Sequence, residues 1–246
     1  MSHPAEQEPF FSRLDRSAFW IAAGASFAIY FATLAPTVTL EDSGELAVAA
    51  DYLGVPHPPG HPFWTLLAWL FTTVFAFVPF RGHPNPAWAA GLLSVVAGAL
   101  ATGLLALLTC RSGRDLLGNL RDPNEQPGRE GLICLAGSVS GALLFALSPA
   151  MWSQSVIIEV YSLNALFMMG ILVLTYRWLV RPTNAGLIAA ALLFGLGLTN
   201  YQVLLLIGVM LALAVLLRDL ELFRDFVLAG LALGMLLLIC RVASTV

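Results

Sequence analysis

Eight apolar runs, each close to the length that crosses a lipid bilayer, constrain this chain more than any other feature of its sequence. A transmembrane helix needs about 20 predominantly apolar residues. The runs cover residues 18–35, 63–80, 88–110, 131–149, 161–180, 185–200, 202–217 and 226–243. Only 11% of the residues are charged, against roughly 25% in soluble domains. The sequence therefore predicts an all-α polytopic membrane protein, and its net charge of −3 gives no reason to expect a nucleic-acid partner.

The distribution of arginine sets the expected topology, because cytoplasmic loops carry an excess of basic residues. If all eight runs cross and the N-terminus is cytoplasmic, four of the twelve arginines lie inside and eight outside. If the run 63–80 enters from the outer side and returns, or lies in the interface, ten lie inside and only Arg81 and Arg241 outside. We therefore predict about seven transmembrane helices plus one re-entrant or interfacial helix, whose backbone must be covered by protein or water.

The same topology divides the chain into regions. We expect a cytoplasmic N-terminal tail at residues 1–17 and a single membrane domain at residues 18–246, with an outer loop at 36–62 and a cytoplasmic loop at 111–130. The polar start of the chain does not fit a cleavable signal peptide, so the first helix should be retained with the N-terminus in the cytoplasm. We expect the location to be a bacterial inner membrane, with lipids as neighbours.

This topology also gathers three polar segments on the outer side. They are residues 36–62, residues 150–160 and the turn between two apolar runs at residues 199–202. Polar groups that gather on one face of an apolar protein indicate a functional site. We therefore look for chemistry in these three segments.

The first polar segment carries three carboxylates within five residues, Glu41, Asp42 and Glu45. In one interpretation, Asp42 or Ser43 caps a short amphipathic helix at the membrane surface, with acidic groups at its positive end. In the other, a carboxylate acts as a general base or a metal ligand. Two neighbouring carboxylates can also separate their pKa values. The pattern alone leaves both interpretations open.

His57 and His61 lie four residues apart, but the prolines around them exclude a continuous helix. We therefore expect no metal pair on one helix face, and nothing in the sequence indicates a divalent metal or another cofactor. A stiff, extended polyproline segment is expected instead. Histidine suits contact with a phosphate or proton transfer near neutral pH; the alternative is a proline-rich helix breaker with interfacial histidines.

The other two polar segments offer fewer candidates. Glu159, Tyr161 and Asn164 lie at the start of the run 161–180. They are either substrate-binding groups or an ordinary helix start with interfacial aromatic residues. The turn at residues 199–202 fits a plain helical hairpin.

Three stretches of the chain resemble the membrane proteins called domain of unknown function 2723, a protein O-mannosyltransferase-like family. They are residues 33–70, centred on "LEDSGELAVAADYLGVPHPPGHP", residues 147–167, "LSPAMWSQSVIIEVYSLNALF", and residues 195–202, "GLGLTNYQ". The resemblance covers roughly residues 20–217. It implies the C-type glycosyltransferase superfamily, whose polytopic enzymes take sugar from a polyprenyl-phosphate donor and work on the outer side.

The resemblance implies roles for the first segment. Asp42 matches the family's acidic position and Glu45 follows it in the same motif. The enzyme hypothesis makes Asp42 the general base, while Glu45 tunes its pKa or binds a sugar hydroxyl. His57 begins the His-Pro-Pro element of the family, and with His61 it would meet the donor phosphate.

The resemblance extends to the second segment and weakens at the third. Glu159 and Tyr161 match the family's Glu-Val-Tyr motif, and with Asn164 they would orient the donor or the acceptor. At the third segment the family often has His after Thr-Asn, whereas this chain has Tyr201. This departure weakens the case for a role of that turn and leaves the plain hairpin as the alternative.

Two functions follow from the sequence. The first is transfer of a sugar from a polyprenyl-phosphate donor to a hydroxyl acceptor on the outer face, with a lipid-linked sugar as partner. The second is that of a shortened, inactive family member that serves as a structural helical subunit beside other membrane subunits. The end of the chain at Val246, directly after an apolar run, and the residue Tyr201 favour the second function. An open outer cavity that reaches Asp42 would favour the first.

Overall fold

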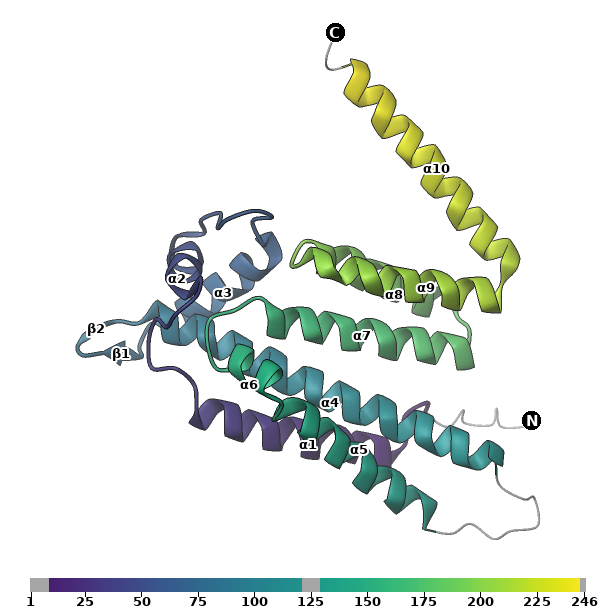
Figure 1. Cartoon of the computed structure of the whole chain (residues 1–246), viewed down its shortest axis with the longest axis horizontal. Helices are drawn as coiled ribbons and strands as arrows, with labels where there is room; N and C mark the ends of the chain where they lie inside the picture. Colours follow the sequence, from purple (N-terminus) through teal and green to yellow (C-terminus); the bar gives the residue numbers. More distant parts are fainter. Residues whose placement is uncertain (1–8, 121–128, 244–246) are drawn as a thin grey trace, which may run out of the picture.

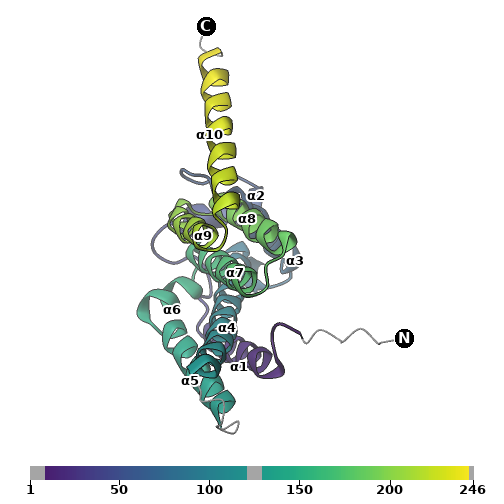
Figure 2. The same cartoon turned by 90° about the vertical axis from the view of Figure 1, so that its right-hand side faces the viewer.

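The structure, a computed structural model, describes residues 9–120 and 129–243. Its elements are α1 (Arg13–Ala32), α2 (Ser43–Tyr52), α3 (Pro62–Val74), β1 (Pro79–Phe80), β2 (His83–Pro84), α4 (Pro86–Leu120), α5 (Glu130–Ala146), α6 (Pro149–Ser155), α7 (Tyr161–Val180), α8 (Asn184–Leu198), the 3₁₀ helix η1 (Gln202–Leu204), α9 (Leu205–Arg218) and α10 (Leu220–Ala243). Helices α1, α4, α5, α7, α8 and α9 run along the long axis, whereas α10 leaves the bundle at an angle (Figures 1 and 2). The predicted all-α class agrees with this architecture, in which β1 and β2 form only a short antiparallel hairpin.

Length and composition do not support the prediction of seven crossing helices. Among the described residues, α4, α7 and α10 are long and apolar enough to span a membrane. A fourth span results if α5 and α6, which meet at a bend of 68°, are counted as one broken helix. The apolar helices α3, α8 and the η1–α9 stretch are shorter than 18 residues, and α1, although 20 residues long, does not meet the hydropathy and charge requirements of a span. About 20 residues are needed to cross about 30 Å of hydrocarbon.

The apolar run 63–80 does not traverse the bundle. Its helical part, α3, has 13 residues and a length of about 20 Å at 1.5 Å per residue. The β1–β2 hairpin follows, and α4 then starts at the same end of the bundle as α2 and α3 (Figure 1). The re-entrant or interfacial position of α3 in a membrane stays a prediction.

The two ends of the bundle differ in charge. We call the end that holds α2, α3 and the hairpin the polar end. The opposite end, which we call the arginine end, holds the start of α1, the end of α4, the α7–α8 connection and the α9–α10 connection (Figure 1). Most described arginines lie on these segments, while Arg81 lies in the hairpin and Arg241 on α10. Arg121 of the predicted cytoplasmic loop lies outside the described residues.

Helix α4 forms the centre of the bundle, and small residues allow its neighbours to approach it closely. A Cβ atom at Gly98 would collide with Ser155 Oγ of α6. A Cβ atom at Gly103 would lie 2.9 Å from the Cβ of Ala23 on α1. Such contacts between small residues are the usual way in which membrane helices pack, because lipid supplies no hydrophobic drive for their association.

A buried ion pair fixes the arginine end. Helix α1 begins with a capping box, in which the Ser12 side chain accepts from Asp15 N–H and the Asp15 carboxylate accepts from Ser12 N–H. The Asp15 residue is fully buried, and its carboxylate also accepts hydrogen bonds from Arg114 Nε at 3.2 Å and Arg114 Nη2 at 2.5 Å. One carboxylate therefore joins the start of α1 to α4.

Loss of the Arg114 guanidinium should destabilise the fold, because it leaves a buried carboxylate without its cation. We expect Arg114→Leu to lower the free energy of unfolding by about 3 kcal/mol, measured by thermal unfolding in detergent. Arg224→Leu is the matched control, since the Arg224–Asp225 pair is more than half exposed and should contribute less than about 1 kcal/mol. Equal melting temperatures for the two variants would contradict this assignment.

Candidate active site

The three polar segments meet at the polar end, around the short non-helical stretch that connects α6 to α7. The backbone oxygen of Glu159 accepts hydrogen bonds from Trp64 Nε1 at 3.2 Å and from Ser94 Oγ at 3.1 Å. The next backbone oxygen, that of Val160, accepts from Asn200 Nδ2 at 3.2 Å. Residues from α3, α4 and the α8–η1 turn thus hold one short stretch of backbone.

His61 links the first segment to the third. Its side chain is almost fully buried, and Nδ1 lies 2.5 Å from the backbone oxygen of Asn200. Because a carbonyl oxygen can only accept, Nδ1 carries the hydrogen. The backbone of His61 has a φ of 41°, in the left-handed region that few non-glycine residues adopt. This conformation places the imidazole inside the fold, against the Asn200 turn.

The segment before His61 is a turn and not the extended polyproline segment that the sequence predicted. Gly60 N–H donates to the His57 oxygen at 2.9 Å, and Gly60 has a φ of 91° that glycine adopts readily. This hydrogen bond reverses the chain and places the centroids of the two imidazole rings 5.6 Å apart. The prediction of polyproline-II geometry was wrong because it counted the prolines and not the glycine that follows them.

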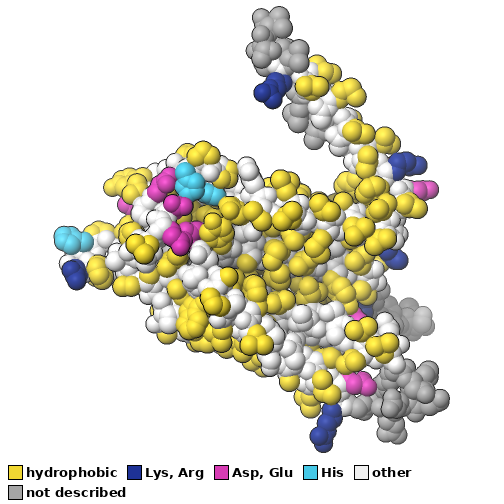
Figure 3. Space-filling view, in the orientation of Figure 1, with side chains coloured by type: hydrophobic (Ala, Val, Ile, Leu, Met, Phe, Trp, Pro, Cys, Tyr) yellow, Lys and Arg dark blue, Asp and Glu magenta, His cyan; other side chains and the backbone are white. Residues whose placement is uncertain are grey.

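His57 is paired with both predicted catalytic carboxylates. Its backbone N–H donates to Glu45 Oε1 at 2.6 Å, and its Nδ1 lies 3.2 Å from Glu45 Oε2. On the other side of the ring, Nε2 lies 3.9 Å from Asp42 Oδ2. The hydrogen bonds from the side chain and then the backbone of His57 lower the pKa of Glu45. Figure 3 shows these acidic and histidine side chains gathered on the surface at the polar end.

Asp42 does not cap α2 with its side chain. It occupies the N-cap position, but its carboxylate makes no capping hydrogen bond, and the side chain is 60% exposed. The neighbouring Ser43 hydroxyl donates instead to the Leu40 oxygen at 2.9 Å. Of the two interpretations left open by the sequence, the capping role therefore fails for Asp42, and its carboxylate is free to meet a ligand.

Glu159 differs from these carboxylates because it is buried. Its residue is 4% exposed, and its Oε2 accepts only a 3.2 Å hydrogen bond from Val160 N–H among the described residues. Burial raises the pKa of Glu159 to about 7, and the charges of Glu41 and Asp42 add to this effect. The polar end therefore holds one carboxylate with a lowered pKa, Glu45, and one with a raised pKa, an arrangement that suits acid–base chemistry.

Sequence reasoning missed Tyr201 and Asn200, whereas Tyr161 and Asn164 of the same site were predicted. The Tyr201 ring lies 5.2 Å from that of Tyr161 and stacks beside His61, so the third segment is part of the site. Asn200 is fully buried there. Asn164 lies one turn along α7, and its Oδ1 is buried without a hydrogen-bond partner in the described part of the chain. A buried polar residue in a turn between two helices has no distinctive sequence signal, and Asn200 was therefore not predicted as a site residue.

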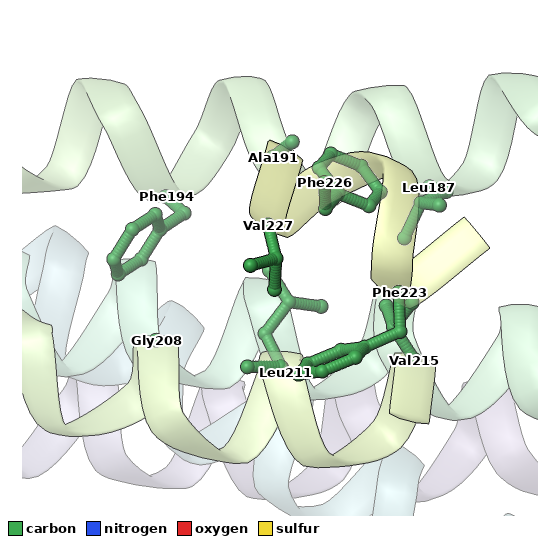
Figure 4. Close-up of a pocket in the computed structure, with 10 residues that line it drawn as sticks. Leu187, Ala191, Phe194, Gly208, Leu211, Val215, Phe223, Phe226 and Val227 are labelled. Carbon is green, nitrogen blue, oxygen red and sulfur yellow. The ribbon is translucent and has the colours of Figure 1, made fainter. Parts of the chain in front are cut away.

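Two open hollows lie beside the carboxylates. One, of about 580 Å³, is lined by residues 38–41 and Ile157. The other, of about 400 Å³, lies between α2 and residues 54–56 and includes Glu45 in its wall. A third cavity, of about 310 Å³, lies between α8, α9 and α10 and is lined by apolar residues such as Leu187, Phe194 and Phe226 (Figure 4). None of the predicted site residues lines this third cavity.

Asp42, Glu45 and His57 also have the ligand atoms that a divalent cation needs. One ligand atom from each residue lies within 4.8 Å of the others, and all three residues are exposed. Carboxylate oxygen and imidazole nitrogen are common metal ligands. The geometry therefore permits a cation at this position, although the sequence indicated none.

The comparisons place the chain among known proteins. Residues 42–223, about three quarters of the chain, match the family described as the protein O-mannosyl-transferase TMEM260 N-terminal domain. The chain belongs to this family. The match confirms the O-mannosyltransferase-like part of the resemblance, and leaves untested the label 2723 and the superfamily.

Relatives of the chain are eukaryotic and much longer. It is 36% identical over 160 residues to the protein O-mannosyl-transferase TMEM260 of Mus musculus, an alignment that covers 64% of this chain and 19% of the relative. It is 30% identical over 139 residues to the protein O-mannosyl-transferase tmem260 of Dictyostelium discoideum, covering 56% and 14%. The chain thus spans less than a fifth of these relatives, and no solved structure matches it. A bacterial inner membrane and a cytoplasmic N-terminus stay predictions.

The buried Glu159 carboxyl group should make stability depend on pH. Because its pKa is about 7 in the fold and about 4.5 as the reference value, the folded state binds more protons between these pH values. We therefore expect stability to fall as pH rises from about 4.5 to about 7, by on the order of 2 kcal/mol from this group. Melting temperatures of wild type and Glu159→Gln across this range measure the effect, which the variant should lack. Glu221→Gln, at an exposed position of α10, should retain the wild-type profile.

Proposed function

We propose that this TMEM260-family domain transfers a mannosyl group from a polyprenyl-phosphate donor to a protein hydroxyl group on the outer face of the membrane. The observation that carries the proposal is the set of unequal carboxylates beside an open hollow: Asp42 and Glu45 exposed around His57, and Glu159 buried nearby. The names of the two relatives support mannose and a protein acceptor. The apolar helices that are long enough to span a membrane support a site that a membrane lipid can reach.

The transfer needs one proton acceptor and one group that assists departure of the phosphate. The acceptor hydroxyl oxygen attacks the anomeric carbon, and its proton passes to the Asp42 carboxylate. A carbon–oxygen bond forms, while the bond from the anomeric carbon to the phosphate oxygen breaks and its electron pair leaves with the phosphate. His57 is exposed and can donate a hydrogen bond to that phosphate. His61 is buried beside it and supports the His57 ring from the protein side. Glu45 holds His57 in place, and Glu159, Tyr161 and Asn164 orient the substrates.

The rival hypothesis, a structural helical subunit without activity, receives less support. The two hypotheses differ in whether an open outer cavity should reach Asp42. The hollow lined by residues 38–41 and Ile157 does not include Asp42 in its wall, whereas the second hollow includes Glu45, the neighbouring carboxylate of the same motif. Tyr201, which first counted against activity, packs onto His61 and so belongs to the site.

Replacement of Asp42 tests the proposal directly. We expect Asp42→Asn to lower the rate of mannosyl transfer by about 10²–10⁴-fold, because the amide cannot accept the proton. The assay follows labelled mannose from polyprenyl-phosphate mannose to protein in membranes that contain the chain. Asp51→Asn is the matched control, since Asp51 is an exposed acid on the same helix α2. Undiminished transfer by Asp42→Asn would remove Asp42 from the mechanism.

Removal of metal separates base catalysis from a metal-dependent mechanism. The proposal uses Asp42 as the base and His57, held by Glu45, as the hydrogen-bond donor to the phosphate, so we expect transfer to continue in membranes treated with EDTA. A loss that added Mg²⁺ or Mn²⁺ restores would show that the three residues hold a cation instead.

A further inference from the structure

Four aromatic rings form a continuous row across the polar end. The rings of His57 and His61 lie 5.6 Å apart, and those of His61 and Tyr201 lie 6.2 Å apart with an interplanar angle of 26°. Tyr201 in turn meets Tyr161 edge to face, at 5.2 Å and 80°. The row draws on the first and third polar segments and on the start of α7, and one of its ends lies beside the Asp42 and Glu45 carboxylates.

Buried hydrogen bonds hold the middle of this row, the His61 ring, in place. The imidazole of His61 is hydrogen-bonded to the Asn200 oxygen, and the Asn200 side chain is hydrogen-bonded to Val160. Tyr201 follows Asn200 directly in the chain, and Val160 directly precedes Tyr161. One fully buried residue, Asn200, therefore sets the positions of both tyrosines. The aromatic surface is preorganised, so binding to it need not order its side chains.

The outer side of the row is accessible. Tyr161 is 41% exposed and Tyr201 is partly exposed, whereas His61 and Asn200 beneath them are buried. A tyrosine ring combines an apolar face with a polar hydroxyl group. Three carboxyl groups lie near the row, those of Asp42, Glu45 and Glu159, and their oxygens can accept hydrogen bonds from hydroxyl groups.

We propose that Tyr201 and Tyr161 form a stacking platform for the hexose ring of the lipid-linked sugar. A hexose has C–H groups on its ring faces and hydroxyl groups at its edge, which match an aromatic face bordered by carboxylates. A phosphate group or a prenyl chain matches only one of these features. The inference rests on the proposed function, and it assigns the sugar-binding surface to Tyr201, the residue at which this chain departs from the expected pattern.

A pair of lipids that differ only in the sugar tests the platform. The probes are polyprenyl-phosphate mannose and polyprenyl phosphate of the same prenyl length, and the measurement is their affinity for the full chain in nanodiscs. We expect Tyr201→Leu to weaken binding of the mannose-bearing lipid by about 3- to 10-fold and to leave binding of the sugar-free lipid unchanged. Tyr201→Phe, which keeps the ring, should retain most of the affinity. Tyr52→Leu is the control, because Tyr52 is 79% exposed on α2 and is not part of the row.

The possible outcomes separate the platform from the function on which it rests. Equal weakening of both lipids, or no change for either, would overturn the platform while leaving the transferase proposal intact. Failure of the wild-type chain to bind either lipid would overturn the proposed function and the platform with it. If Tyr201→Leu does not fold, as judged by its melting temperature, Tyr161→Leu at the exposed end of the platform tests the same expectation.

Discussion

The architecture of the polar end depends on two backbone carbonyl groups, those of Glu159 and Val160. A break between helices leaves carbonyl oxygens without helical donors, and burying them unpaired would cost stability. Three side chains distant in sequence supply the missing donors: Trp64, Ser94 and Asn200. Each donor comes from a different part of the chain, so satisfying this one break brings α3, α4 and the α8–η1 turn together. The polar groups of the candidate site are therefore positioned by a structural requirement of the backbone.

The same non-helical stretch creates an electrostatic difference between two carboxyl groups of the site. Because the Glu159 backbone is held by Trp64 and Ser94, its carboxyl group stays in a buried environment that favours the protonated form. Glu45 stands in a more solvated position and receives hydrogen bonds from His57, which favour the ionised form. Two identical functional groups thus have opposite tendencies within one site. The difference arises from where the backbone places them and not from any difference in side-chain chemistry.

The sequence predicted the members of the site better than the way in which they are assembled. Counting arginines placed the three polar segments on one side, and the structure brings them into contact; Asp42, Glu45 and His57 also lie together. The contact between His61 and the Asn200 backbone spans 139 positions, and no local pattern of residues encodes it. The number of spans was overestimated, because hydropathy registers apolar runs and not the turns, such as the Ser148–Pro149 break, that shorten their helices. Tyr201 was misjudged because its role depends on tertiary stacking.

The two ends of the bundle hold their carboxylates in opposite environments. At the arginine end, Asp15 is fully buried, and its carboxylate is satisfied by Arg114 and by the Ser12 backbone. Such a carboxylate has no capacity left for a ligand. At the polar end, Asp42 is exposed, its carboxylate does not cap α2, and the His57 imidazole lies 3.9 Å away. Of the two carboxylates, only that of Asp42 is therefore placed where a ligand can reach it, because solvent and one imidazole surround it instead of a cation and a backbone N–H.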